Sequence, residues 1–404
     1  MVNPANEILK PLSSLKWLIM VSVIIYIVFS PFYLWGSLTI GDIWLGFVLF
    51  LVPLSYQLSM SLVHFWKTKY FSLSLFLSIA MLSTIFIVPS PLNNSKFIVQ
   101  FMFIVWILIP LISIGIFQMN SPLLFLEVCS WIYLTIFTIG VILYFGLGLD
   151  WVLSNSGNRR FHLWFNSNAL QMVTLCLSTA YIFKGTKFCW RYIVMLLGAI
   201  AVFIFNASRT GFLTIIFVVG IAALMSLRKP RTFILSIIIG YGIFYLLFSA
   251  VIQNKLGIAV RTDFLRDDVR LDSIYVAWQV LTHDWTNWLF GIGWGNSGDG
   301  TRFNIVVHNI LLQVLTESGI FTLLILCCWL SLPLIWVWKL KQFDGIERTF
   351  VILGSVAVWI FLLFNSLSCE RIYWLGFAIL VGMGYRLRVF SKLSQSTPRN
   401  KITV

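Results

Sequence analysis

The chain has 404 residues, of which 59% are hydrophobic and 10% are charged, and its mean hydropathy is +0.93. Soluble domains carry about 25% charged residues, so this composition excludes an ordinary soluble protein. The formal net charge is +14, but its basic residues lie largely in short connections between apolar runs, as membrane topology requires. The charge is therefore no argument for nucleic acid, and we expect no nucleic-acid partner.

Apolar runs of about 20 residues, the length of helix that crosses a bilayer, recur along the chain. They predict an all-α polytopic membrane protein, one integral membrane domain over 1–404, with about 12 transmembrane helices. A β-barrel would show short alternating segments, and the first run lacks the cleavage pattern of a signal peptide. The predicted spans are 17–36, 40–62, 71–89, 97–117, 123–149, 167–183, 191–207, 210–227, 232–251, 319–338, 348–367 and 371–387.

The connections on the two sides of these spans differ in their basic residues. One side carries 11 Lys and 7 Arg, and the other carries 2 Lys and 8 Arg. Because cytoplasmic loops retain Lys and Arg, the first side is predicted to be cytoplasmic and to hold both termini. Topology does not explain arginine on the outer side. Since arginine binds phosphate oxygens in pairs, an arginine-rich outer face favours a bound anion; scattered loop arginines with headgroup contacts are the alternative.

Residues 158–170, "NRRFHLWFNSNAL", lie at the predicted outer mouth of the sixth span. Arg159 and Arg160 suit a phosphate group, while Asn166 and Asn168, among aromatic residues, suit sugar hydroxyls. They are candidate substrate-binding residues. The alternative is an ordinary belt of interfacial aromatic residues.

Arg209 lies in "FNASRTGFLTII", 205–216, between two apolar runs. A charge at mid-bilayer costs roughly 2.5–3.5 kcal/mol, so this arginine is expected at a membrane edge or in a polar cavity. Ser208 or Asn206 can cap the following helix, whose free N–H groups favour an anion, and Gly211 permits close approach. We interpret Arg209 as a phosphate ligand; a snorkelling arginine is the alternative.

The longest connection, 252–318, lies between the ninth and tenth predicted spans on the outer side. Long loops are usually functional or disordered, and this one is rich in Trp, Gly and Asp, so we predict an ordered cap. Its segment 305–317, "IVVHNILLQVLTE", has apolar residues at helical spacing and is predicted to lie over or dip into the membrane. No internal repeat is evident, which disfavours an inverted-repeat transporter.

Three arginines of this loop precede a stretch of near-helical spacing within 261–281. We favour Arg270 over Arg261 and Arg266 as an anion ligand, because an apolar helical run starts immediately after it. A solvated helix with weak local ion pairs is the alternative.

The end of the loop contains "GIGWGNSGDG", 291–300, and then His308. The glycine-rich stretch lacks the strand–turn–helix context of a nucleotide loop and predicts a flexible turn. His308 lies in an apolar helical stretch and can accept a proton from a hydroxyl group, although a structural hydrogen bond is the alternative. Arg302 and Glu317 are further candidate substrate-binding residues.

No motif calls for a metal or another cofactor. The chain has no HExxH, no Asp-x-Asp pair and no GxSxG, and its six cysteines show no paired metal spacing. The cysteines mostly lie in apolar runs, which is typical of core packing. We expect neither metal nor cofactor.

In this order, the pieces resemble the bacterial O-antigen polymerase and ligase superfamily. The resemblance covers about 155–320 and rests on the Arg- and Asn-rich mouth, "SRTG" at 208–211, Arg270 before a helix ending in "GIGWG", and "HN" followed by "ESG" at 317–319. Many members have Asn-Pro-Asn where this chain has Asn-Ser-Asn at 166–168.

The resemblance implies a GT-C-like, metal-independent glycosyltransferase of the Gram-negative inner membrane, with its active site facing the periplasm. The donor would be a glycan on undecaprenyl diphosphate. His308 would activate the acceptor hydroxyl, Arg209 and Arg270 would hold the diphosphate, and Arg159 or Arg160 would orient a substrate.

The family contains two activities, and the sequence slightly favours the first. A polymerase transfers the chain onto another lipid-linked repeat unit, with a chain-length-regulating co-polymerase as a partner; a ligase transfers it onto lipid A–core. "SRTG" and the Asn-x-Asn pair resemble polymerases more closely. A transporter or flippase for the same lipid is the alternative from another class; it needs no proton acceptor.

Overall fold

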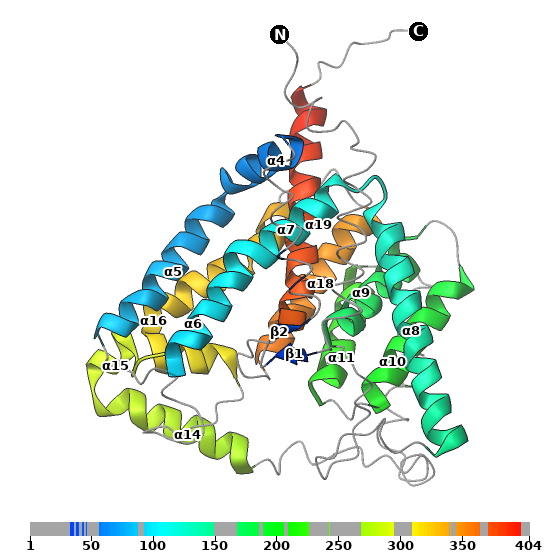
Figure 1. The fold of residues 1–404 in the computed structure, drawn as a ribbon. Helices are drawn as coiled ribbons and strands as arrows, with labels where there is room; N and C mark the ends of the chain where they lie inside the picture. Colours follow the sequence, from blue (N-terminus) through cyan, green and yellow to red (C-terminus); the bar gives the residue numbers. More distant parts are fainter. Residues whose placement is uncertain are drawn as a thin grey trace.

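A computed structural model of the protein describes residues 33–35, 38–39, 43, 46, 56–87, 93–148, 168–185, 189–205, 209–225, 242, 268–294, 309–338, 340, 345–363 and 371–396. Within these ranges the chain is helical apart from one short pair of strands (Figure 1). The coarse prediction of a helical protein is therefore confirmed.

The helices follow the predicted apolar runs closely. Their bounds are α4 Tyr56–Trp66, α5 Lys69–Ile87, α6 Asn93–Phe103, α7 Ile109–Gln118, α8 Pro122–Leu147, α9 Asn168–Lys184, α10 Trp190–Phe205, α11 Arg209–Met225, α14 Asp268–His283, α15 Trp285–Phe290, α16 Ile310–Leu330, α17 Leu332–Trp338, α18 Ile346–Leu363 and α19 Arg371–Ser396. Most of the predicted spans 17–36, 40–62 and 232–251 lies outside the described residues.

By length and composition, four of the described helical stretches can cross a membrane. They are Ile98–Gln118, Pro122–Leu143, Ile310–Leu330 and Ile346–Leu363. Shorter apolar helices, such as Leu170–Lys184 and Trp190–Phe203, lie beside them. The protein is thus compatible with embedding in a membrane, while the count of twelve spans and the GT-C arrangement stay predictions.

The two strands were not predicted. β1 (Tyr33–Trp35) and β2 (Leu38–Thr39) pair antiparallel, with Tyr33 opposite Thr39 and Trp35 opposite Leu38. β1 lies within the predicted span 17–36, so the helix predicted there is wrong for 33–35, and β2 lies between this span and the next.

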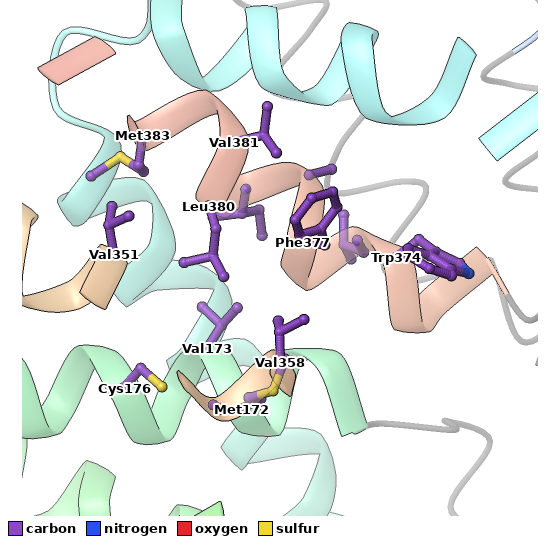
Figure 2. Packing of buried hydrophobic residues seen from close by; sticks show 14 of the residues in the cluster. Met172, Val173, Cys176, Val351, Val358, Trp374, Phe377, Leu380, Val381 and Met383 are labelled. Atoms are coloured by element: carbon purple, nitrogen blue, oxygen red, sulfur yellow. The ribbon is translucent and has the colours of Figure 1, made fainter. Parts of the chain in front are cut away.

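α9 lies at the centre of the helical assembly and packs against α8, α10, α11, α18 and α19. Figure 2 shows side chains of α19, among them Leu380, beside Val358 of α18 and Val173 of α9. α19 also packs closely on α7, where the Ser113 hydroxyl donates to the Ala378 carbonyl at 2.9 Å. A Cβ on Gly382 would lie 2.7 Å from the Ser113 carbonyl oxygen, so glycine allows this approach.

Between α6 and α7 the helix widens into a π-helical stretch, η1 (Ile104–Leu108). There the Tyr70 hydroxyl of α5 donates to the Val105 carbonyl at 2.6 Å. A π-turn leaves backbone groups displaced from their usual partners, and this side chain satisfies one of them inside the protein.

Candidate functional site

The connections between helices gather at two ends of the molecule. The lower end in Figure 1 holds α14, α15, the start of α16, the start of α11 and the end of α8. We call α14, α15, the turn 291–294 and residues 310–318 the cap. We call the opposite end the basic end; the end of α4, the start of α5, the end of α9 and the last turns of α19 lie there. The described basic residues of these helix ends, and of the starts of α10 and α18, are His64, Lys67, Lys69, Lys184, Arg191, Arg348, Arg386, Arg388 and Lys392.

Two glycine-containing segments of the cap bind each other through their backbones. The N–H of Ile292 donates to the Thr316 carbonyl at 2.9 Å, and the N–H of Gly293 donates to the Glu317 carbonyl at 3.0 Å. Trp294 follows at 1% exposure. Residues 291–294 thus form a buried turn, since glycine allows close packing, while residues 295–300 lie outside the described residues and flexibility stays a prediction.

We call the paired segments 291–294 and 316–319 the interlock. At two of its positions the backbone conformation and the close neighbours allow only glycine. Gly291 has φ 72° and Gly319 has φ 78°, a region unfavourable for other residues. A Cβ on Gly291 would overlap the Glu317 backbone, and one on Gly319 would overlap the Leu289 carbonyl. "GIGW" and "ESG", two pieces of the family resemblance, therefore meet in space.

α16 begins at Ile310, nine residues before the predicted span 319–338, and Asn309 caps it. The Asn309 side chain accepts from the Leu312 N–H at 3.0 Å. Non-helical angles at Gly319 bend the helix where the span was predicted to start. The predicted helix over 305–317 is confirmed from Ile310 onward, and residues 305–308 lie outside the described residues.

α14 packs on the first turn of α16 and joins α15 through side chains. Ala277 is fully buried and contacts Leu312. The Asn287 amide of α15 donates to the Val280 carbonyl of α14 at 2.8 Å. Arg270 lies in the first turn of α14, about two turns before Ala277. The predicted helix after Arg270 is confirmed, and its backbone joins the same cap as the start of α16.

Glu317 is the one candidate site residue whose side chain the structure describes. It is 1% exposed, and its Oε1 accepts from the Gln313 amide at 3.4 Å. Its backbone carbonyl forms part of the interlock. Its role in binding a substrate stays a prediction.

Arg209 and Asn168 are the first residues of α11 and α9, respectively. The close approach at Gly211 is toward the Phe203 ring of α10, where a Cβ would overlap. Both residues thus lie at helix N-termini, where backbone N–H groups favour anions. Arg159, Arg160, Asn166, Arg302 and His308 lie outside the described residues; His308 immediately precedes the Asn309 cap.

The sequence analysis missed Gln171, one turn into α9 beyond Asn168. Its side chain is fully buried, and neither amide atom has a hydrogen-bond partner. A buried amide without partners costs free energy, so Gln171 is a further candidate for binding a polar group. The sequence could have indicated Gln171, because its amide lies between the apolar residues Leu170 and Met172.

Charges at the cap are few among the described residues. Asp284 caps α15, and the Thr286 N–H, at 2.9 Å from its Oδ1, lowers the pKa of this carboxyl group. Within the part of the chain that the structure describes, no three His, Cys, Asp or Glu side chains gather to hold a metal. The expectation of no metal stays a prediction.

At the basic end, by contrast, two arginine side chains form hydrogen bonds with backbone carbonyls of the protein itself. Arg386 donates to the carbonyls of Phe117, Met119 and Asn120 at 3.0, 2.6 and 3.3 Å, and Arg348 donates to the Val337 carbonyl at 3.3 Å. The carbonyls of Phe117, Met119 and Val337 lie at the ends of α7 and α17, where a positive charge is favourable, and that of Asn120 follows directly after α7.

A second basic-end contact joins α8 and α10. Arg191 pairs with Glu127 at 3.3 Å, and the Tyr192 hydroxyl donates to the same carboxylate at 3.0 Å. The Arg191 side chain is 50% exposed, so this is a surface ion pair anchored on a buried carboxylate.

No protein-family model matches the chain, and no curated protein matches it.

Proposed function

We propose that the protein is an inner-membrane glycosyltransferase that polymerises undecaprenyl-diphosphate-linked repeat units of an O-antigen or related polysaccharide. The reaction takes place at the cap, which we assign to the periplasmic face. The cytoplasmic basic end and the arginine-rich outer side of the sequence support this orientation.

The observation that carries the proposal is the interlock between 291–294 and 316–319. It joins two motifs of the family resemblance through backbone hydrogen bonds. α14, with Arg270 in its first turn, packs on the helix whose capping residue Asn309 directly follows His308. The motifs between 270 and 319 thus belong to one folded unit, as a site assembled from them requires.

The chemistry follows from the residue types. An acceptor hydroxyl attacks the anomeric carbon of the donor, and the bond from that carbon to the diphosphate breaks. His308 takes the hydroxyl proton, while Arg209 and Arg270 stabilise the charge on the departing diphosphate. Arg159, Arg160, Asn166 and Asn168 bind the substrates at the mouth, and Gln171 adds a buried amide one turn further in.

The test uses purified full-length protein in nanodiscs with lipid-linked repeat units as the only substrate. The unmodified protein lengthens them into a ladder on a glycan gel. His308→Ala, Arg209→Ala and Arg270→Ala abolish the ladder while eluting as folded protein. His283→Ala and Arg371→Ala are matched controls that keep it, since neither residue has a role in the reaction. A normal ladder from a site variant removes that residue from the mechanism.

Lysine variants sharpen the arginine assignment. Arg209→Lys and Arg270→Lys keep the charge but lose the paired N–H donors that bind phosphate oxygens. We expect transfer to fall nearly as far with lysine as with alanine. Full activity with lysine would mean that only charge is needed at that position.

Two alternatives have distinct outcomes in the same system. A ligase leaves lipid-linked repeat units unchanged until lipid A–core is added. A flippase moves the lipid across the membrane and continues to do so after His308→Ala. The interlock and the buried Gln171 suit a transferase with a fixed polar site better than a flippase. Between the two transferases we put polymerisation first, because "SRTG" and the Asn-x-Asn pair resemble polymerases more closely.

A further inference from the structure

α14 and α15 expose a stripe of large apolar side chains. Ile274, Tyr275 and Trp278 of α14 are 48%, 62% and 55% exposed, and Trp285 of α15 is 70% exposed. The Trp278 ring meets the Trp288 ring edge-on at 5.6 Å, which holds the two helices' aromatic groups together. Several exposed aromatic residues side by side are unusual on a surface that faces only water.

The rest of α14 has two other faces. Ala277 and Leu281 are fully buried against the protein. Gln279 and His283 are exposed and polar. At 100° per residue, Ile274, Tyr275 and Trp278 fall between the buried face and the polar face. The helix therefore separates protein, apolar surroundings and water around its circumference, as an interfacial helix does.

The position of the stripe in the fold indicates its surroundings. α14 runs across the lower end of the molecule, crosswise to α19 (Figure 1). α15 packs on α16, and just past the Gly319 bend α16 exposes Phe321 and Leu324, at 57% and 55%. The helix that follows the cap thus also exposes large apolar side chains, and it is long and apolar enough to cross a membrane.

The charge of the stripe identifies the kind of surface. Residues 274–294 contain no Lys or Arg, and Asp284 is their one acidic residue. Anionic lipid patches and nucleic acids are bound by basic clusters, which this segment lacks. Tryptophan and tyrosine, however, favour the headgroup layer of any bilayer.

We infer that α14 and α15 are an interfacial anchor that lies in the headgroup layer of the outer leaflet and binds zwitterionic phospholipid through Ile274, Tyr275, Trp278 and Trp285. The anchor depends only on the membrane embedding of the protein and not on glycosyl transfer. It fixes the cap at the depth where a membrane-bound lipid presents its headgroup.

The test places the photo-crosslinking residue p-benzoylphenylalanine at position 278 or, as the matched control, at position 279 of the full-length protein. Both positions are exposed on α14 but lie on different faces. Each variant is reconstituted in phosphatidylcholine nanodiscs and irradiated, and intact-protein mass spectrometry detects adducts. We expect a mass increase of one phospholipid at position 278 and none above background at position 279. Co-elution with the unmodified protein confirms folding.

Other results overturn the inference. Equal lipid adducts at both positions, or none at either in folded protein, would show that the stripe does not face lipid. A crosslinked dimer at position 278 in nanodiscs that hold two copies would show that a second copy of the chain covers it. Tyr275 and Gln279 give a second pair of positions if the variant at 278 fails to fold.

Discussion

The cap and the basic end satisfy backbone carbonyls at or near helix ends with different kinds of donor. At the basic end, arginine side chains bind the carbonyls that end α7 and α17. At the cap, backbone binds backbone at the interlock, and glycines make the approach feasible. The basic end thus uses arginine side chains for structure, whereas the interlock is held by backbone groups.

The comparison shows that residue type alone does not identify a ligand site. Arg386 is as suited to phosphate as Arg209 by its chemistry, but the protein's own carbonyls occupy its guanidinium. At the cap end, the buried Gln171 amide lacks partners altogether. Ligand sites are therefore better sought where polar groups are left for a ligand than where charge is densest.

The largest expected effect comes from the interlock. Gly319→Ala forces a Cβ into the Leu289 carbonyl at φ 78°, so we expect the free energy of unfolding to fall by more than about 4 kcal/mol. Thermal unfolding in detergent measures it. Gly220→Ala is the control, since its Cβ meets nothing within 4 Å, and it should change stability by at most about 1 kcal/mol. Equal behaviour of the two variants would contradict the interlock.

A second variant tests the basic end. Arg386→Met leaves the carbonyls of Phe117, Met119 and Asn120 without this donor, so we expect a loss of about 3 kcal/mol. Chemical or thermal unfolding gives the value. The exposed Lys392 lies on the same helix, and Lys392→Met should stay within about 0.5 kcal/mol of the parent. A neutral Arg386→Met would show that water replaces these bonds.

Gln171 sharpens the contrast between stability and function. Gln171→Leu removes a buried amide without partners, so we expect a gain in stability of about 1–2 kcal/mol together with weaker glycan transfer. Thr174→Val is the control, because the Thr174 hydroxyl already donates to the Leu170 carbonyl at 2.7 Å. That variant should bring no gain. A loss of stability in Gln171→Leu would indicate that the amide is structural.

The surface pair at the basic end should matter less. Arg191→Met removes a half-exposed partner of Glu127, while the Tyr192 hydroxyl keeps its bond to the carboxylate. We expect a loss of less than about 1 kcal/mol that shrinks as salt is added. Unfolding at low and high ionic strength measures both, and a large, salt-independent loss would contradict this view.

The smallest effect is a pH dependence at Asp284, the N-cap residue of α15. Folding lowers the pKa of the Asp284 carboxyl group. The ionised carboxylate therefore stabilises the folded state at pH values above the unfolded pKa, and this stabilisation is lost as the pH falls through the folded pKa. Amide exchange of α15, corrected for its intrinsic pH dependence, should therefore quicken in acid. Asp284→Asn removes this acid response, and an unchanged response in that variant would assign it elsewhere.

The positions of the helices were predictable because each apolar run is long and bounded by polar residues. The structure places α8, for example, at Pro122–Leu147, where the sequence predicts 123–149. The join at Gly319 was not predictable: the sequence indicated a helix before it and a span after it, but not one bent helix. Periodicity identifies a helix, whereas its junction depends on the segment packed against it.

The candidate site was predictable in part. Helical spacing placed Arg270 on a helix and glycine content marked 291–294, but neither feature indicates which distant backbone lies opposite. The structural use of Arg386 was also missed, because counting basic residues reports a side of the membrane and not a partner. Long-range pairing is fixed by packing, which a pattern along one chain does not contain.

The hydrogen bonds from Arg386 to the end of α7 have a consequence for biosynthesis. Phe117 precedes Arg386 by 269 residues, so α7 leaves the ribosome long before the guanidinium that binds its last carbonyls exists. Completion of this end is therefore a late event in synthesis, because a nascent chain that stops before α19 lacks the donor for the carbonyls of Phe117, Met119 and Asn120.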